Sequence, residues 1–382
     1  MRDPCPHASR VRREGVREHS LNGCLLEAEY PTREARQSMA EHSNELRFAV
    51  TLQGVEPPDV FQHQVRELEG LGFSQLWVTD SSLHARYVYA YLTLAALNSE
   101  RLLLGTGVTN PFTRHPGMTI NAIATVDEIS RGRMILGIGA GDSPTSELGY
   151  APARRRDLAE MVSAARRLFS GEILSHNDST YRWTNAQLHY RYRDQVPVYM
   201  AGSGPRMLEL AGEIADGVIA QCGLFPAAVD LACEHIATGA QRAGRSLDDI
   251  DLWIMACGTI SEDRRQALDG SRAMAAWFAR MAPYYCQVAG VDPALVKRIQ
   301  EVYSGGEFHL AEQAAALVPD EMVELFTLAG TPDEARDRIA RLADRGVNGI
   351  NFMPIGPRRT ASFQLFARFV APLRTGNGTS SQ

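Results

Sequence analysis

Two aspartates follow short apolar runs of the sequence and could carry acid–base chemistry. Asp80 comes directly after the run Gln75–Thr79, and Asp142 follows the glycine-rich segment Gly137–Gly141. A carboxyl group at the end of a buried strand can accept a hydrogen bond from a cofactor, and it can donate a proton if burial raises its pKa. Each carboxyl group could instead cap the helix that follows it. Asp80 and Asp142 are therefore the candidate catalytic residues, with helix capping as the alternative role.

Two glycine-rich turns could bring the backbone close to a ligand. Gly202-Ser203-Gly204-Pro205 stands between an apolar run and a predicted helix, where free backbone amides favour a phosphate. An ordinary tight turn is the alternative. Gly137-Ile138-Gly139-Ala140-Gly141 is similar to a dinucleotide fingerprint, but Asp142 stands where G-x-G-x-x-G requires glycine. A Rossmann site is therefore weakly supported, and the residues around Ser203 do not form the G-x-S-x-G motif of a serine hydrolase.

The elements that must position these residues are strands and helices in alternation. Eight strand-like runs alternate with helical patterns, at Leu46–Leu52, Gln75–Thr79, Arg101–Val108, Met134–Gly139, Val196–Met200, Gly217–Gln221, Ile250–Ile260 and Ile350–Pro354. Eight such units predict a closed (β/α)8 TIM barrel, with an open doubly wound sheet as the alternative. Active sites of TIM barrels lie at the C-terminal ends of the strands. The aspartates and glycine-rich turns would then share one mouth of the barrel.

The segment before the eighth strand is long enough to hold an insertion. Residues from about Arg280 to Leu317 are rich in aromatic side chains and could cover the barrel mouth. Further on, Thr331-Pro332-Asp333-Glu334 has the form of a capping box, which predicts a helix start with Thr331 as N-cap. Gly346 then stands where a helix end favours glycine.

Other polar and aromatic side chains allow two interpretations each. His84 and His115 fall in loops near the predicted mouth, where each could contact a substrate or be merely exposed. The adjacent Tyr284 and Tyr285 could line a pocket or pack in the core. Asp127 lies inside a helical pattern, which favours a structural role.

The two ends of the chain differ from its middle. Residues 1–45 carry scattered Arg and Glu, little apolar periodicity and no apolar core of a signal peptide. We therefore expect a flexible N-terminal extension over residues 1–45, one barrel domain over 46–374, and a flexible C-terminal tail over 375–382.

The composition narrows the class of protein. A hydrophobic fraction of 45%, a charged fraction of 22% and a net charge of -6 are typical of a soluble globular protein. Mild acidity gives no reason to expect nucleic acid or a membrane as partner. The six cysteines form no CxxC pair, which fits reduced thiols in a cytoplasm, and no dense metal-ligand spacing predicts a metal.

The span from Leu76 to about Leu148 resembles the bacterial luciferase-like flavin and deazaflavin oxidoreductases, and among them the methylenetetrahydromethanopterin reductase branch. The likeness is carried by Gly107–Pro116 and Ala124–Arg133, and it continues through Gly137–Asp142. A second match lies at Ala201–Pro205, followed by Ala215-Asp216-Gly217. The resemblance implies a luciferase-like barrel with a coenzyme at its mouth, coenzyme F420 in this branch and FMN in others.

The resemblance also implies roles for single residues. Gly107-Val108 matches a non-prolyl cis peptide against the coenzyme ring, Asp142 a proton donor, and Asp80 a coenzyme contact. Arg114 and Arg206 lie near enough to help bind the anionic tail of the coenzyme. The expected cofactor-binding residues are Asp80, Gly107, Val108, Thr109, Gly139, Ala140, Gly141, Asp142, Ser143, Gly202, Ser203, Gly204 and Pro205.

Two departures from the branch concern the substrate. Ser81 stands where relatives often have His, and Val50-Thr51-Leu52 replaces an acidic residue near the end of the first strand. The prediction is therefore an F420-dependent oxidoreductase, a homodimer or higher homo-oligomer, that transfers hydride to or from an unidentified small organic molecule. An FMN-dependent monooxygenase and a non-catalytic flavin-binding protein are the alternatives.

Overall fold

The computed structural model describes residues 46–141, 143–177, 180–305 and 308–371. The predictions made for residues 1–45 and 375–382 and for the Asp142 side chain fall outside the described residues.

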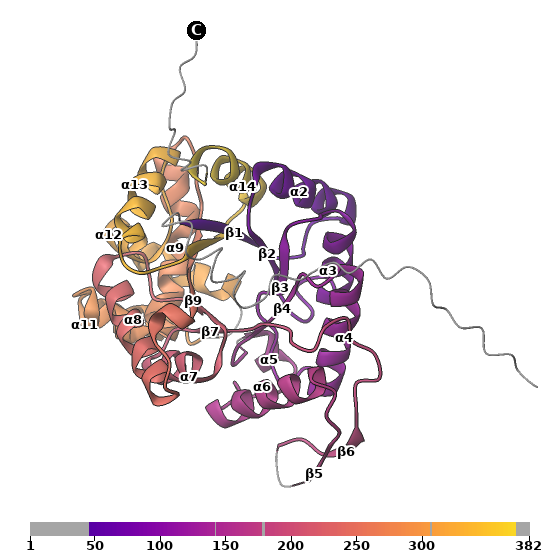
Figure 1. Ribbon diagram of the computed structural model, residues 1–382. Coiled ribbons are helices and arrows are strands. Elements are labelled where there is room, and N and C mark those ends of the chain that lie inside the picture. The colour runs from indigo at the N-terminus through magenta and orange to yellow at the C-terminus, as the bar shows by residue number, and fades with distance from the viewer. Residues whose placement is uncertain (1–45, 142, 178–179, 306–307, 372–382) are drawn as a thin grey trace, which may run out of the picture. The chain divides into compact units, whose positions relative to one another are not determined.

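Eight parallel strands close into a barrel (Figure 1). Their order around the barrel is β1-β10-β9-β8-β7-β4-β3-β2, and β1 pairs with both β10 and β2. The strands are β1 (Arg47–Leu52), β2 (Gln75–Val78), β3 (Leu103–Thr106), β4 (Met134–Ile138), β7 (Val198–Gly202), β8 (Gly217–Ala220), β9 (Asp251–Gly258) and β10 (Gly349–Pro354). The predicted barrel is confirmed, and the open sheet is wrong.

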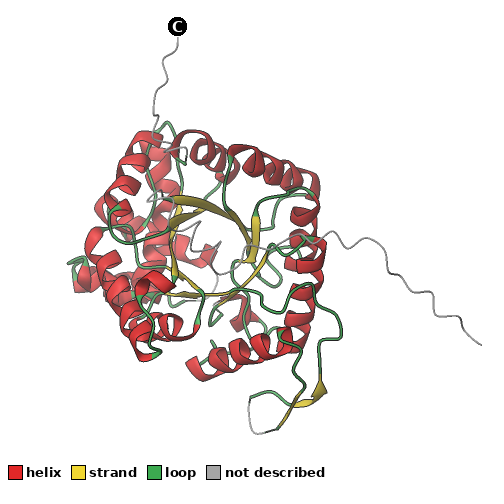
Figure 2. Ribbon diagram, viewed as in Figure 1, coloured by secondary structure: helices red, strands yellow, loops and turns green. Residues whose placement is uncertain are grey.

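Helices surround the barrel on its outside (Figure 2). They are α2 (Pro58–Leu71), α3 (Val88–Leu97), α4 (Pro116–Ile129), α5 (Ser143–Glu147), α6 (Arg155–Phe169), α7 (Pro205–Ile214), α8 (Pro226–Arg242), α9 (Arg264–Met281), α10 (Pro283–Val288), α11 (Pro293–Val302), α12 (Asp320–Phe326), α13 (Pro332–Ala343) and α14 (Arg359–Leu365). The 3-10 helices are Leu247–Asp249 and Phe308–Leu317, and Phe366–Val370 forms a π-helical turn. None of the described helices is both long and apolar enough to cross a membrane.

The capping box predicted at Thr331 is present at the start of α13. The Glu334 amide donates to Thr331 Oγ1 at 3.4 Å, and the Thr331 amide donates to Glu334 Oε2 at 2.8 Å. Two amides that a helix start would otherwise leave without a partner are satisfied in this way. Gly346, just beyond the helix, has a φ of +71°.

Large and small side chains alternate inside the barrel. The interior cluster contains Ala49, Trp77, Ile135, Tyr199, Ile219 and Trp253. The Trp77 ring fills the room that glycines leave on the next two strands: a Cβ added at Gly105 would lie 2.3 Å from this ring, and one at Gly137 would lie 2.8 Å from it. A Cβ at Gly217 would lie 2.5 Å from Tyr199. The interior is thus a packed core that supports the mouth from below.

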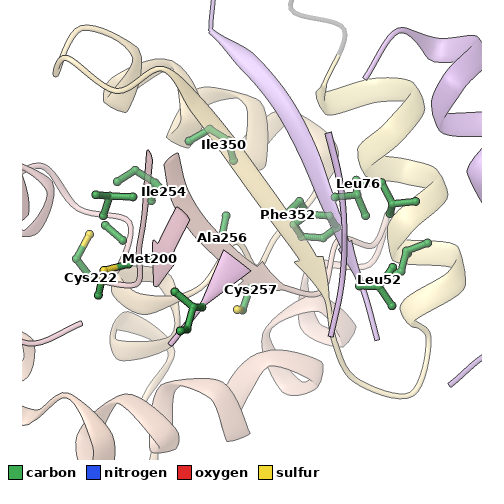
Figure 3. Close-up of a cluster of buried hydrophobic side chains, with 14 of the residues drawn as sticks. Leu52, Leu76, Met200, Cys222, Ile254, Ala256, Cys257, Ile350 and Phe352 are labelled. Carbon is green, nitrogen blue, oxygen red and sulfur yellow. The ribbon is translucent and has the colours of Figure 1, made fainter. Parts of the chain in front are cut away.

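A second and larger cluster lies between the strands and the helices. Because side chains alternate along a strand, Leu76 joins this outer cluster while its neighbour Trp77 points inward. Figure 3 shows Leu76 of β2, Leu52 of β1 and Phe352 of β10 in one region of this layer. Phe352 also stacks on Phe366, with ring centres 4.2 Å apart. The outer layer fixes the helices on the barrel.

An antiparallel hairpin between α6 and β7 was not predicted. It consists of β5 (Leu174–His176) and β6 (Trp183–Ala186), and Figure 1 shows it outside the ring of helices. Trp183 is buried, and its ring lies 4.8 Å from that of His115 at the start of α4. The hairpin is therefore anchored to the segment that follows β3.

The segment before β10, where an insertion was predicted, contains the short helices α10 and α11. α10 packs on α8 and α9, and α11 packs on α9. Tyr285 and Tyr303 are buried in these contacts. That this segment also covers the mouth stays a prediction.

Candidate active site

The predicted site residues meet at one end of the barrel. β2, β3, β4 and β7 are consecutive neighbours in the closed sheet. Asp80 follows β2, Gly107-Val108 follows β3, and Gly202–Pro205 begins at the end of β7. Since the strands are parallel, these residues share the C-terminal mouth, where active sites of this fold lie.

The Asp80 carboxylate is held by two residues of the segment after β3. Thr109 Oγ1 donates to Asp80 Oδ2 at 2.6 Å, and Arg114 Nη2 donates to the same oxygen. Asp80 is 8% exposed. It does not cap α3, whose N-cap is Tyr87 with no side-chain hydrogen bond, so the capping alternative is wrong for Asp80. The residue is a buried carboxylate with a partly buried counter-charge.

Two tyrosines complete this charged cluster. The Arg114 guanidinium carbon lies 5.5 Å from the ring centre of Tyr87 and 5.3 Å from that of Tyr89, distances that allow cation–π attraction. Burial raises the pKa of Tyr89, while the hydroxyls of Thr119 and Thr109 act in the opposite direction. Burial lowers the pKa of Arg114, which nevertheless remains charged. The expected role of Arg114 at an anionic tail is therefore less supported than its bond to Asp80.

The Gly107-Val108 peptide bond is cis, as the family resemblance implied. It lies between two backbone hydrogen bonds that continue the barrel ladder: Gly107 donates to the Val78 carbonyl at 2.7 Å, and Thr109 donates to the Gly137 carbonyl at 2.9 Å. A Cβ added at Gly139 would lie 2.8 Å from Val108 Cγ2. Gly139 therefore provides space for the Val108 side chain rather than direct space for a ligand.

The turn after β4 requires glycine. Gly141 has a φ of +81°, and a Cβ there would lie 2.5 Å from Thr145 Cγ2. The Ala140 carbonyl accepts a hydrogen bond from the Ala153 amide at 2.7 Å. α5 begins at Ser143. The turn thus leads directly into Asp142, which lies outside the described residues.

The turn after β7 has features of an anion site. α7 begins at Pro205, and its N-cap Gly204 makes no side-chain capping bond. A Cβ added at Gly204 would meet no atom within 4 Å, whereas one at Gly202 would lie 2.9 Å from Met207 Cγ. Open space beside the first turn of a helix without a side-chain cap suits a phosphate group.

The other candidate residues have structural contacts. His115 accepts a hydrogen bond from the Gly117 amide and caps α4. His84 pairs with Glu147 of α5, which joins the segments that follow β2 and β4. Tyr285 is buried, which fits the core interpretation. Asp127 pairs with an arginine far from the mouth, which agrees with the structural role that its helical position favoured.

Tyr87, Tyr89 and the Asp80–Arg114 bond were missed by sequence reasoning. The signal that could have found the tyrosines is their place at the start of the helix that follows a candidate strand end, with Tyr87 as its N-cap and Tyr89 in its first turn. No pattern in the sequence pairs Asp80 with Arg114, because 34 positions separate them.

This chain is similar in sequence and in fold to known proteins. Residues 35–349 match the model of the luciferase-like monooxygenase family. A 5,10-methylenetetrahydromethanopterin reductase from Methanolobus tindarius is 33% identical over 85% of this chain and 99% of its own. An F420-dependent glucose-6-phosphate dehydrogenase from Nakamurella multipartita is 30% identical over 78% and 85%. The solved structure of a coenzyme F420-dependent tetrahydromethanopterin reductase from Methanopyrus kandleri superposes with a TM-score of 0.76 at 30% identity, covering 86% of this chain and 99% of that one.

These matches span most of the chain and nearly all of the first relative. The chain belongs to the luciferase-like monooxygenase family.

Proposed function

We propose that this protein is an oxidoreductase that uses coenzyme F420, a deazaflavin, to transfer hydride to or from a small organic molecule. Relatives that span the chain at 30% identity or more carry F420-dependent activities in their names. The observation that carries the proposal is the mouth itself. It holds a buried, ion-paired carboxylate at Asp80 and, across β3 and β4, an open glycine turn at Gly204.

The residues present fit a ring with a phosphate-bearing side chain. The backbone amides around Gly204 would hold the phosphate, because they start a helix whose N-cap is a glycine and therefore has no side chain to bond them. Asp80 would accept a hydrogen bond from the ring, and Thr109 would fix its orientation. Asp142 would give or take the proton that accompanies the transfer. When bound, the coenzyme supplies the hydride chemistry, and the protein supplies binding, orientation and exclusion of water.

The substrate is proposed only by class, as a small organic molecule. Ser81 stands where relatives often have His, and Val50-Thr51-Leu52 replaces an acidic residue of the methanopterin reductases, so methanopterin itself is not part of the proposal. At this position the chain has the hydroxyl group of Thr51 in place of a carboxylate, and Thr51 Oγ1 donates to Asn351 Oδ1 at 2.9 Å inside the barrel. We further propose that the protein forms a homo-oligomer.

The direct test is a pair of titrations of the purified protein, one with F420 and one with FMN. We expect F420 to bind at least about ten times more tightly, a difference of about 1.4 kcal/mol. The change in coenzyme fluorescence measures both dissociation constants. Protein that purifies with stoichiometric FMN, or that consumes oxygen with reduced FMN, would favour the monooxygenase instead. Binding of F420 without turnover of any alcohol, aldehyde or imine substrate would favour a binding protein.

A further inference from the structure

Arg114 is a cation held inside the mouth by three separate segments. Its Nη2 donates to Asp80 Oδ2, after β2, and to Thr109 Oγ1 at 3.2 Å, after β3. Its guanidinium lies over the rings of Tyr87 and Tyr89, at the start of α3. The side chain is 18% exposed. A charge so far removed from water depends on these partners for its stability.

The Asp80 carboxylate has one oxygen engaged within the protein. Both hydrogen bonds that the described residues donate to it, from Thr109 and from Arg114, end on Oδ2. Rotating the carboxylate would break both bonds at a buried position, which is costly. The second oxygen, Oδ1, is therefore an acceptor in a fixed orientation. A ring N–H is the donor that such an oxygen suits.

We propose that Arg114 is a positioning residue for coenzyme binding, which fixes Asp80 through Oδ2 and thereby presents Oδ1 to an N–H group of the coenzyme ring. This inference rests on the proposed function and deepens it, since it names the residue that prepares the acceptor. Arginine suits this role better than lysine. Its planar group can bond Asp80 and Thr109 with one nitrogen while its face packs on the tyrosine rings, whereas an ammonium group is a point charge.

The chain offers a matched control for the loss of a buried arginine. Arg193 Nη2 donates to Asp127 Oδ1 at 2.8 Å, and the two side chains are 11% and 2% exposed. The same Nη2 donates to the carbonyl of Met134, the first residue of β4, so this pair lies at the opposite end of the barrel. Removing either arginine leaves a buried carboxylate without its counter-charge, but only one of these carboxylates is at the mouth.

The experiment measures the dissociation constant of F420 for six proteins: wild type, Arg114→Gln, Arg114→Lys, Asp80→Asn, the double variant Asp80→Asn/Arg114→Gln, and Arg193→Gln. We expect Arg114→Gln and Asp80→Asn each to weaken binding by about tenfold or more, which corresponds to about 1.4 kcal/mol. The double variant should bind no more weakly than Asp80→Asn, because Arg114 acts through Asp80. Arg114→Lys should recover part of the affinity. Arg193→Gln should unfold more easily and keep its affinity within about twofold, or about 0.4 kcal/mol.

Three results would overturn the proposal. They are wild-type affinity in Arg114→Gln, losses that multiply in the double variant, and an equal loss in Arg193→Gln. If Arg114→Gln does not fold, the double variant, which leaves no unpaired charge, and Arg114→Lys decide between the same outcomes. If the wild type binds FMN and not F420, the proposed function fails, and the same series titrated with FMN still tests Arg114.

Discussion

Asp80 and Asp127 are both buried carboxylates paired with an arginine, yet their surroundings differ. Asp127 accepts hydrogen bonds from Arg193 and from the Met134 amide, so its oxygens are used within the protein. Burial raises the pKa of Asp127, and the arginine opposes this shift. The hydrogen bonds that the described residues donate to Asp80 end on a single oxygen. The second oxygen, for which these described residues provide no donor, marks Asp80 as a binding residue more than the ion pair does.

Asp142 is the residue for which a catalytic role is predicted most directly. If its carboxyl group transfers a proton, Asp142→Asn should lower turnover by about 100-fold to 10,000-fold while F420 affinity changes far less. The measurements are the turnover number and the dissociation constant of F420 on the same preparation. A variant with unchanged turnover and weakened binding would give Asp142 a positioning role instead.

Strand counting was sufficient to place Asp80 at the mouth, because a residue that follows a barrel strand has one possible location. The same reasoning could not supply its partner. Arg114 lies in the loop that follows β3, and its contact with Asp80 depends on the course of that loop after Gly107-Val108. Local periodicity does not predict the course of a loop. Gly139 is a further example: its role in coenzyme binding stays a prediction, and the sequence did not reveal that a Cβ there would lie 2.8 Å from Val108 Cγ2.

At the scale of elements, the strands below the mouth are shaped by size differences between neighbouring side chains. Trp77 of β2 occupies space above Gly105 of β3 and Gly137 of β4. The interior of a barrel is a closed volume, so a large side chain on one strand requires small ones beside it. The positions of β2, β3 and β4 therefore depend on one another, and with them the positions of the segments that carry the site.

Gly105→Ala tests this dependence. A Cβ at Gly105 would lie 2.3 Å from the Trp77 ring, which is fully buried in the interior cluster, so we expect the free energy of unfolding to fall by about 3 kcal/mol, the upper end of typical overpacking costs. Urea unfolding measures it. Gly70→Ala is the control: this exposed position in α2 has nothing within 4 Å of the added atom, and alanine should stabilise the helix by up to about 1 kcal/mol. Equal stability of Gly105→Ala and wild type would contradict the packing argument.

Elements with strong periodicity were predicted well, and short irregular ones were not. The eight strands lie within a few residues of their predicted bounds, since each is a buried apolar run. The β5–β6 hairpin escaped prediction because its strands are three and four residues long and half exposed. It is anchored by tertiary contacts that period-2 patterns do not reveal, among them the contact of Trp183 with His115 and the hydrogen bond from the Tyr181 hydroxyl to the Pro111 carbonyl.

At the scale of the whole molecule, one helix supports the proposed homo-oligomer. The sequence of α3, VYAYLTLAAL, contains no charged residue, which is typical of a helix buried on all sides. Leu97 at its end is nevertheless 67% exposed, and Met118 of the neighbouring α4 is 62% exposed. Leu97 ends α3 and Met118 lies in the first turn of α4, so the two exposed side chains lie toward opposite ends of adjacent helices, and a second copy of the chain that covers both would lie along this pair of helices. Light scattering on the purified protein measures how many copies of the chain associate, and we expect two or more.

The barrel closes through β1, so we expect that residues before β1 can be removed and that β1 itself cannot. β1 pairs with β10 and β2, and Arg47 at its start pairs with Asp251 of β9 and lies 5.1 Å from the ring centre of Trp253. Residues 1–38 carry little apolar periodicity in the sequence. We therefore expect that removal of residues 1–38 leaves the melting temperature and the F420 affinity unchanged.

Removal of residues 1–49 is the control for that truncation. It deletes half of β1, so β10 and β2 lose the strand between them and the barrel interior opens to water. An open edge of this kind exposes backbone donors and acceptors and part of the interior cluster, and we expect this variant to be insoluble or unfolded. Both variants and the full chain are compared by thermal melting, F420 titration and light scattering. If the variant lacking residues 1–38 melts well below the full chain, the first residues belong to the fold. If the variant lacking residues 1–38 keeps its melting temperature but no longer forms the homo-oligomer, those residues belong to the interface between copies of the chain.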